Sequence, residues 1–197
     1  MKEVARSYVW WPNLVGDLEG MVRLWLSCPA TRLLPTVAPV TPWVWPHMLW
    51  ERLHMDFAHK EGHDFLLVVD MHSKWPEILT MTSTTGQAAV VAVRDVFARF
   101  RLPTQVVTDN GPQFVSSEFT LFLQRNGIKH IRVSPYHPAS NGAAERLVQS
   151  FKRSLSAAAA STVSIRQRLA EFLLSYRTTP HATTGRTPFS LLMNREC

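Results

Sequence analysis

The sequence has 197 residues, of which 46% are hydrophobic, and its formal net charge at pH 7 is +6. A chain of this length and composition can bury a real core in one ordinary domain plus an appendage. It contains no run of 18 or more apolar residues and no leader-like N-terminus, and its two cysteines give no sign of a disulfide framework. We therefore expect an intracellular protein with no membrane span.

The charges are distributed unevenly along the chain. Residues 51–100 carry seven acidic and five basic side chains, whereas residues 151–197 carry two acidic and seven basic ones. An acidic, metal-binding centre beside a basic flank that holds a polyanion would have this arrangement. A solvated basic helix face would give the same counts, so charge alone leaves both interpretations open.

The first segments indicate a small helical region followed by a linker. Residues 14–27 follow Asn13, a candidate N-cap, and space their apolar residues as a helix does. Residues 29–49 contain five prolines and predict an extended linker, because proline removes a backbone donor and disfavours helix before it. We expect a domain boundary near residue 48.

The rest of the chain predicts an α/β fold. Three strand-like segments come first and favour an antiparallel meander: 50–58, 65–71 and 76–81. Beyond them helices and strands alternate, which favours parallel pairing with helical crossovers. The expected helices are 86–101, 116–126, 142–160 and 164–178, and the expected strands are 104–108 and 128–133. The prediction is a mixed sheet with helices on its faces, followed by a turn-rich tail.

Two aspartates are candidates for a metal site. Asp109 follows the strand 104–108, where an α/β sheet presents functional groups, and the Asn110-Gly111 turn leaves its carboxylate exposed. Asp56 interrupts an apolar run, where a carboxylate is costly unless it is paired or binds a cation. If their strands are neighbours, the two carboxylates repel each other, and a divalent cation between them would relieve this repulsion. Oxygen ligands of this kind favour magnesium or manganese over zinc. The alternative is that Asp109 only shapes the turn.

A third carboxylate belongs to Glu145, one turn into a helix that opens at Ser140-Asn141-Gly142. Its neighbours Ala143 and Ala144 are small, which we expect to leave room for a substrate, and 35 residues separate Glu145 from Asp109. The alternative is an acid that the helix macrodipole stabilises at a helix N-terminus, which is common.

With these residues the sequence resembles the retroviral and LTR-retrotransposon integrases, especially the gypsy class, and their D,D(35)E arrangement. The matching stretches are HMDFA, VVDMHSKWPE, VVTDNGPQF, GIKHIRVSPYHPASNGAAERLVQSFKRSL and YRTTPHATTGRTPFSLLM. The resemblance covers the chain from about residue 7 to its end. It implies an RNase H-like fold with a five-stranded mixed sheet flanked by helices, and a catalytic, metal-binding triad of Asp56, Asp109 and Glu145.

The resemblance also implies a polynucleotidyl transferase and endonuclease that uses two Mg²⁺ or Mn²⁺ ions. Asp56 would bridge both ions, Asp109 would bind one and Glu145 the other. Water as the nucleophile gives 3′-end processing, and the resulting 3′-hydroxyl gives strand transfer, without a covalent enzyme intermediate. The implied partners are element ends, a target DNA duplex and further copies of this chain in a homodimer or larger oligomer. No small-molecule substrate is implied, and the protein is expected to act in the nucleus.

Further residues are candidates for DNA contacts, and for each a purely structural role is equally open. They are Tyr136, His137, Asn141, Arg146, Gln149, Lys152 and Arg153. Asn141 and Gly142 are also expected to shape the loop before Glu145. We expect Trp75 and the pair Trp10-Trp11 to be packing residues, because buried aromatics are commoner than base-stacking platforms.

The N-terminal region departs from the family pattern. Residues 1–30 resemble a remnant of the helical H2C2-type zinc module, which the linker 31–48 would join to a catalytic core with C-terminal helices at 49–197. Cys28 fits the last zinc ligand, but Trp25 replaces the other cysteine and residues 1–30 contain no histidine. A structural zinc site needs four ligands, so no zinc is expected. Four histidines elsewhere lack ligand spacing and are expected to be ordinary strand and loop residues: His54, His59, His63 and His72.

Two hypotheses follow for this chain. The first is an active integrase-type transferase with an intact triad. The second is a catalytically inactive, domesticated or degraded module that binds nucleic acid or protein. The incomplete zinc module favours this second hypothesis, as does an expected lack of an SH3-like or chromodomain-like module after Cys197. The chain is accordingly expected to be a fragment or a degraded copy. An RNase H or resolvase on the same fold is disfavoured, because the flanking blocks are integrase-like.

Overall fold

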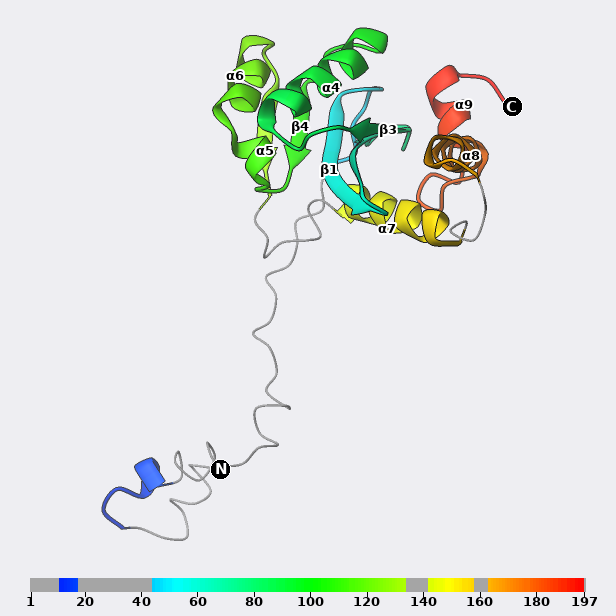
Figure 1. Cartoon of the computed structure of the whole chain (residues 1–197). Coiled ribbons are helices and arrows are strands. Elements are labelled where there is room, and N and C mark those ends of the chain that lie inside the picture. The colour runs from blue at the N-terminus through cyan, green and yellow to red at the C-terminus, as the bar shows by residue number, and fades with distance from the viewer. Residues whose placement is uncertain (1–10, 18–43, 134–141, 158–162, 197) are drawn as a thin grey trace. The chain divides into compact units, whose positions relative to one another are not determined.

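The computed structural model describes residues 11–17, 44–133, 142–157 and 163–196 (Figure 1). The chain divides into two compact units, Met1–Pro42 and Trp43–Cys197. In the first unit residues 14–17 are helical, and the rest of the predicted helix, most of the predicted zinc-module remnant and residues 31–43 of the linker lie outside the described residues.

The expectation that Trp11 is a packing residue is wrong. Trp11 is 41% exposed, and its indole Nε1 donates a hydrogen bond to Asp17 Oδ2 at 2.8 Å. Its neighbour Trp10 lies outside the described residues.

A five-stranded mixed sheet in the order β3-β2-β1-β4-β5 forms the centre of the second unit. Its antiparallel meander consists of β1 (Arg52–Lys60), β2 (His63–Asp70) and β3 (Pro76–Met81). On the other side of β1, β4 (Gln105–Thr108) and β5 (Lys129–Arg132) pair in parallel. The predicted mixed sheet is therefore confirmed.

The described helices of this unit are α4 (Gly86–Arg99), α5 (Pro112–Val115), α6 (Ser117–Arg125), α7 (Gly142–Ala157), α8 (Ile165–Thr178) and α9 (Pro188–Met193). Helices α4, α5 and α6 lie on one side of the sheet, and α7 and α8 lie on the other (Figure 1). Every predicted strand and helix of this unit is present with its ends within two residues of the prediction, except that residues 158–160 lie outside the description.

Two short helices escaped the sequence analysis. α5 begins with Pro112 directly after Gly111, and α9 lies within the tail that was expected to be turn-rich. In α9 the Thr187 side chain caps the helix by accepting a hydrogen bond from the Ser190 N–H at 3.0 Å, and Pro188 occupies the first turn. Helices of four and six residues are too short for a periodic hydrophobic signal, so the proline and the cap were the available clues.

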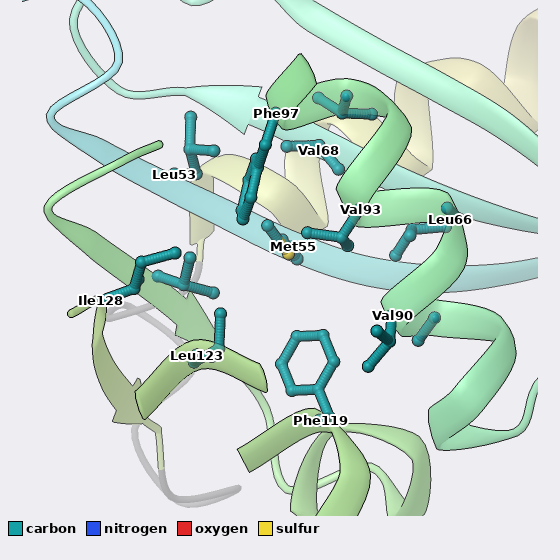
Figure 2. Packing of buried hydrophobic residues seen from close by; sticks show 14 of the residues in the cluster. Leu53, Met55, Leu66, Val68, Val90, Val93, Phe97, Phe119, Leu123 and Ile128 are labelled. Carbon is teal, nitrogen blue, oxygen red and sulfur yellow. The ribbon is translucent and has the colours of Figure 1, made fainter. Parts of the chain in front are cut away.

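Alternation along the strands divides the core into two clusters. Leu53 and Met55 of β1 and Leu66 and Val68 of β2 pack under α4 and α6 (Figure 2). Ala58 and the alternate residues of β2 pack instead under α7 and α8. Each fully buried large aliphatic side chain contributes about 1.5–3 kcal/mol. The same alternation decides which face of the sheet each polar side chain of β1 occupies.

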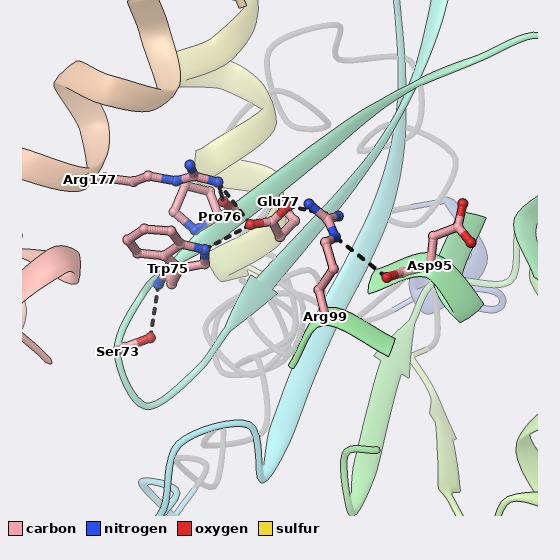
Figure 3. A network of polar contacts seen from close by, with 7 residues as sticks. All are labelled: Ser73, Trp75, Pro76, Glu77, Asp95, Arg99 and Arg177. Atoms are coloured by element: carbon pink, nitrogen blue, oxygen red, sulfur yellow. Dashed lines mark hydrogen bonds and ion pairs between the residues drawn. The ribbon is translucent and has the colours of Figure 1, made fainter. Parts of the chain in front are cut away.

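A buried ion network connects the two helical layers through the edge strand β3 (Figure 3). Glu77 is 6% exposed and forms ion pairs with Arg99 of α4 at 3.1 Å and Arg177 of α8 at 2.9 Å. The Trp75 indole donates to the same carboxylate at 2.9 Å, while the Arg177 guanidinium stacks 4.0 Å from the Trp75 ring centroid. Trp75 is buried, so its predicted packing role is confirmed.

Candidate active site

The carboxylates of Asp56 and Asp109 lie at equivalent positions of two neighbouring parallel strands. The β1–β4 pairing ends with His54 opposite Val107, and each aspartate lies two residues beyond its member of that pair. The sequence left open whether the two strands are neighbours, and the sheet order shows that they are. Asp56 shares its strand face with Ala58, which packs under α7, so its carboxylate lies on the side of the sheet that α7 covers.

Glu145 reaches this centre from the first turn of α7, which contacts both β1 and β2. The Glu145 side chain is half-buried, whereas Ala144 is fully buried in the cluster under α7. The expectation that Ala144 leaves room for a substrate is wrong, because its small side chain instead lets the helix approach the sheet closely. The side chain of Ala143 lies outside the described residues.

Electrostatics links the three carboxylates. Burial raises the pKa of Asp56 to about 6, and the charges of Asp109 and, less strongly, Glu145 act in the same direction. The Phe57 N–H, 2.8 Å from Asp56 Oδ1, and the Lys152 ammonium oppose this rise. Within the part of the chain that the structure describes, the Phe57 N–H is the sole hydrogen-bond donor to Asp56. Asp56 is thus a half-buried carboxylate whose ionised form is disfavoured by neighbouring negative charge.

Asp109 shapes its turn, as the alternative interpretation held. Its Oδ1 accepts a hydrogen bond from the Gly111 N–H at 3.0 Å, and a Cβ added to Gly111 would lie 3.0 Å from that oxygen and 2.4 Å from Gln113 Nε2. The closer of these two atoms is the far end of a flexible side chain, and Gly111 has an ordinary φ of −55°, so the turn does not by itself require glycine at 111. Asp109 remains exposed, and among the described residues no side chain forms an ion pair with it. Turn formation and ligand binding are compatible roles for one carboxylate, because it has two oxygens.

The donor set suits a hard divalent cation. Three carboxylates, one of them with a raised pKa caused partly by the other two, are relieved by positive charge between them. Within the described ranges, however, no group of three or more His, Cys, Asp or Glu side chains is arranged closely enough to hold a single ion. The carboxylates are therefore close enough for Asp109 and Glu145 to affect the ionisation of Asp56, but the three do not converge on one ion position.

The residues predicted to contact DNA fall into three groups. Tyr136, His137 and Asn141 lie outside the described residues. Gln149 and Lys152 follow Glu145 at helical spacings of four and seven, and the influence of Lys152 on Asp56 places its charge near the carboxylates. The remaining two, Arg146 and Arg153, are exposed on the adjacent stripe of α7.

Three of the histidines in and after β1 and β2 have partners within the protein. His59 pairs with Asp64 at 2.7 Å, the His63 ring contacts the Glu61 carbonyl at 2.8 Å, and the His72 ring contacts the Pro46 carbonyl at 2.9 Å. His54 is buried within the sheet. These are the contacts of ordinary strand and loop histidines, as predicted.

Sequence reasoning missed a cavity beside α7 whose lining combines apolar and cationic side chains. Its volume is about 490 Å³, and its lining includes Lys74, Arg146, Tyr176 and His181. Lys74 and His181 stand in the quoted stretches VVDMHSKWPE and YRTTPHATTGRTPFSLLM, but neither received a role. Their shared location depends on tertiary contacts between segments about a hundred residues apart, which spacing along the chain does not indicate.

Comparison with known proteins decides the family. Residues 47–138 match the integrase core domain. The chain is 38% identical over 190 residues to an uncharacterized protein of Caenorhabditis elegans, and this match covers 95% of the chain and 15% of that protein. It is 34% identical over 155 residues to the Pol polyprotein of Feline endogenous virus ECE1, covering 75% of the chain and 14% of the polyprotein. The chain belongs to the retroviral and retrotransposon integrase family.

Solved integrase structures share its fold. The catalytic core domain of BIV integrase aligns with a TM-score of 0.62 at 22% identity, covering 74% of this chain and 95% of that domain. A chain in the structure of the simian T-cell lymphotropic virus intasome in complex with the PP2A regulatory subunit B56 gamma aligns with a TM-score of 0.72 at 18% identity, covering 89% of this chain and 66% of that one. The expected integrase-core, RNase H-like fold is confirmed. No helix among the described residues of this integrase core is long and apolar enough to cross a membrane.

Proposed function

We propose that this integrase core cuts and joins DNA by metal-dependent phosphoryl transfer, with Asp56, Asp109 and Glu145 as its catalytic residues. The observation that carries the proposal is Asp56: a half-buried carboxylate with one hydrogen bond among the described residues and two further carboxylates acting on it. Such an arrangement costs folding free energy, so it needs a reason other than stability.

These three side chains would hold two divalent cations, Mg²⁺ or Mn²⁺. When bound, such ions activate an attacking oxygen and stabilise a leaving oxygen in an in-line displacement. Asp56, on which the charges of both other carboxylates act, would serve both ions, and the hydrogen bond from the Gly111 N–H would orient Asp109. Attack by water would process a DNA 3′ end, and attack by the resulting 3′-hydroxyl would join that end to a target strand.

DNA is the proposed substrate because α7 combines the acidic centre with basic side chains. Arg146 and Arg153 are exposed and Lys152 is half-buried beside the carboxylates, so a phosphate backbone lying along α7 would meet positive charge next to Glu145. The integrase relatives and the intasome neighbour support element ends and target duplex as ligands and a homodimer or larger oligomer as the working form. Action in the nucleus follows from this role.

A second candidate is a DNA-binding or protein-interaction module without turnover. The spacing of the carboxylates favours it, since among the described residues no three of them converge on one ion position. The proposed remnant character of residues 1–30, without zinc, points the same way, because a missing zinc module would remove one DNA-binding part.

Cleavage and disintegration of a branched DNA substrate with Mg²⁺ or Mn²⁺ separate the two candidates. In the full chain we expect Asp109→Asn and Glu145→Gln each to reduce the rate by at least about 100-fold, because each removes a negative charge that would hold a cation, and the cations would stabilise the negative charge that develops during the reaction. Asp95→Asn, the same change at an exposed position of α4, is the matched control and should retain the wild-type rate.

Two outcomes would contradict the proposal. Equal rates for wild type and both triad variants would remove these carboxylates from the reaction. A folded wild-type chain that binds DNA with strong salt dependence but does not cleave it would favour the module without turnover.

A further inference from the structure

The cavity beside α7 is lined on several sides by positive and hydroxyl-bearing side chains. It lies between the turn after β2, the first half of α7, the last turn of α8 and the segment 179–183. None of its described lining residues is acidic, and its volume of about 490 Å³ falls in the range of small-molecule sites. It does not include Asp56, Asp109 or Glu145, although Arg146 connects it to the active site through α7.

Lys74 is the buried cation of this cavity. It is 5% exposed, and its backbone has φ +62°, a left-handed conformation that lysine rarely adopts. The Asp70 carbonyl holds this turn by accepting the Lys74 N–H at 2.8 Å, and the Lys74 ammonium lies 4.1 Å from the Trp45 ring centroid. Lys74 therefore combines a buried side chain with a backbone conformation that is unfavourable for lysine.

No carboxylate among the described residues lies within ion-pair distance of the Lys74 ammonium. The nearest candidate, Asp70, is buried and already accepts hydrogen bonds from Ser73 Oγ at 2.6 Å and from the backbone N–H groups of Ser73 and Trp50 at 3.0 and 3.1 Å. A buried ammonium without a direct anionic partner is costly, and an anion in the cavity would supply that partner.

The other polar groups of the cavity are also suited to an anion. The His181 Nδ1 accepts a hydrogen bond from the Thr183 N–H at 3.2 Å, so the neutral ring carries its proton on Nε2 and offers it as a donor. Burial lowers the pKa of His181, and the charges of Lys74 and Arg146 lower it further, so these three groups feel one another. Tyr176 adds an aromatic surface 6.3 Å from the His181 ring centroid.

We propose that this cavity binds the phosphate group of a nucleotide, with Lys74, Arg146 and His181 around the phosphate and the aromatic rings of Phe172 and Tyr176 beside the sugar or base. The cavity is larger than one phosphate requires, which favours a nucleotide over inorganic phosphate. The choice of a nucleotide within a DNA strand as its natural occupant rests on the proposed function, since Arg146 follows Glu145 in α7. A free nucleotide offers the same chemistry.

The binding should depend on pH. Burial lowers the pKa of Lys74 to about 8; Asp70 opposes this, whereas Arg146 and Arg52 add to it, and His181 lies in the same cavity. A bound anion favours the charged form of Lys74. At a pH where the Lys74 amine is neutral, binding is therefore coupled to protonation of that amine. Affinity is therefore expected to be full at pH 7 and to fall about tenfold for each pH unit above about 8.

Titration calorimetry of the full chain in EDTA at pH 7 tests the site with thymidine 5′-monophosphate as the probe. We expect the nucleotide to bind, thymidine not to bind, and Lys74→Met to weaken nucleotide binding at least about tenfold. Arg146→Gln, a change at an exposed position that leaves the core intact, should weaken it about threefold or more. Arg166→Gln, an equal loss of charge at an exposed position of α8 outside the cavity, should not. Equal affinity for thymidine and its monophosphate, or equal affinity in the Arg146 and Arg166 variants, would overturn the proposal.

Competition with single-stranded DNA separates the two sources of the phosphate. Displacement of the mononucleotide by a short oligonucleotide supports a DNA strand as the occupant, and its failure assigns the site to a free nucleotide. The experiment needs no catalysis, so nucleotide binding that persists in Asp109→Asn keeps this site independent of the proposed reaction. An active wild-type chain without nucleotide binding would remove the phosphate site and leave the proposed reaction standing.

Discussion

Glu77 and Asp56 are both carboxylates inside the sheet layer, but their surroundings differ. Glu77 has two arginines and an indole N–H as partners, and these connect α4, β3 and α8. Asp56 has one backbone N–H among the described residues, and two other carboxylates act on it. The partners of a buried charge, more than its burial, therefore separate a structural residue from a candidate for chemistry.

Replacing Glu77 should have the largest effect on stability. Glu77→Gln keeps an oxygen for the Trp75 indole but leaves Arg99 and Arg177 without their carboxylate, and breaking such a buried pair lowers the free energy of unfolding by about 3 kcal/mol. Urea unfolding measures this value. Glu171→Gln, at an exposed position of α8, is the control and should change it by less than about 0.5 kcal/mol. A similar loss in both variants would mean that the network does not stabilise the sheet.

Replacing Asp56 should have the opposite sign. Its folded pKa of about 6 lies above the ordinary aspartate value of 3.8, so the folded state binds the proton more tightly and stability falls as pH rises from about 4 to 6. Asp56→Asn removes this fall and should raise the free energy of unfolding by about 2 kcal/mol at pH 7 in EDTA, and by nearly nothing at pH 3.5. Thermal unfolding at the two pH values provides the measurement. Destabilisation at pH 7 would show that the carboxylate has stabilising partners.

Lys152 should have the smallest effect. Its charge lowers the Asp56 pKa, so Lys152→Gln should raise that pKa further by a few tenths of a unit, equivalent to a few tenths of a kcal/mol. Carboxyl NMR titration of Asp56 resolves such a change. Arg153→Gln, one residue further along α7 and exposed, should change the Asp56 pKa less. A larger effect of Arg153→Gln than of Lys152→Gln would mean that Arg153, and not Lys152, lies on the side of α7 nearer to Asp56.

Part of the site could be predicted because its signals are local. Asp109 follows a short buried strand and precedes Asn110-Gly111, and that combination alone placed a carboxylate at the end of a strand. Asp56 stood out because a charge interrupts an apolar run. The change of hydrophobic period favoured parallel pairing, but only the β1–β4 pairing in the structure shows that these two strands are neighbours.

The roles of Glu77, Ala144 and Lys74 could not be predicted in the same way. Glu77 and Arg177 are 100 residues apart in the chain, and nothing near either residue identifies the other as its partner. The small side chain of Ala144 was expected to leave room for a substrate, yet it packs against the sheet. The left-handed backbone of Lys74 has no sequence signal, because lysine does not favour it.

The sequence by itself determined the order of strands and helices along the chain, the positions of Asp109 and Glu145 at element ends and of Asp56 within a strand, and the likeness to integrases. Hydrophobic period, turn residues and motif spacing are local properties, so they can be read along the chain. Only the tertiary structure decided which charges have partners: Glu77 with two arginines, Asp56 between carboxylates, and Lys74 in a cavity with Arg146 and His181. The physical reason is that desolvation and Coulomb energy depend on distance in space, and packing brings together segments that are remote in sequence.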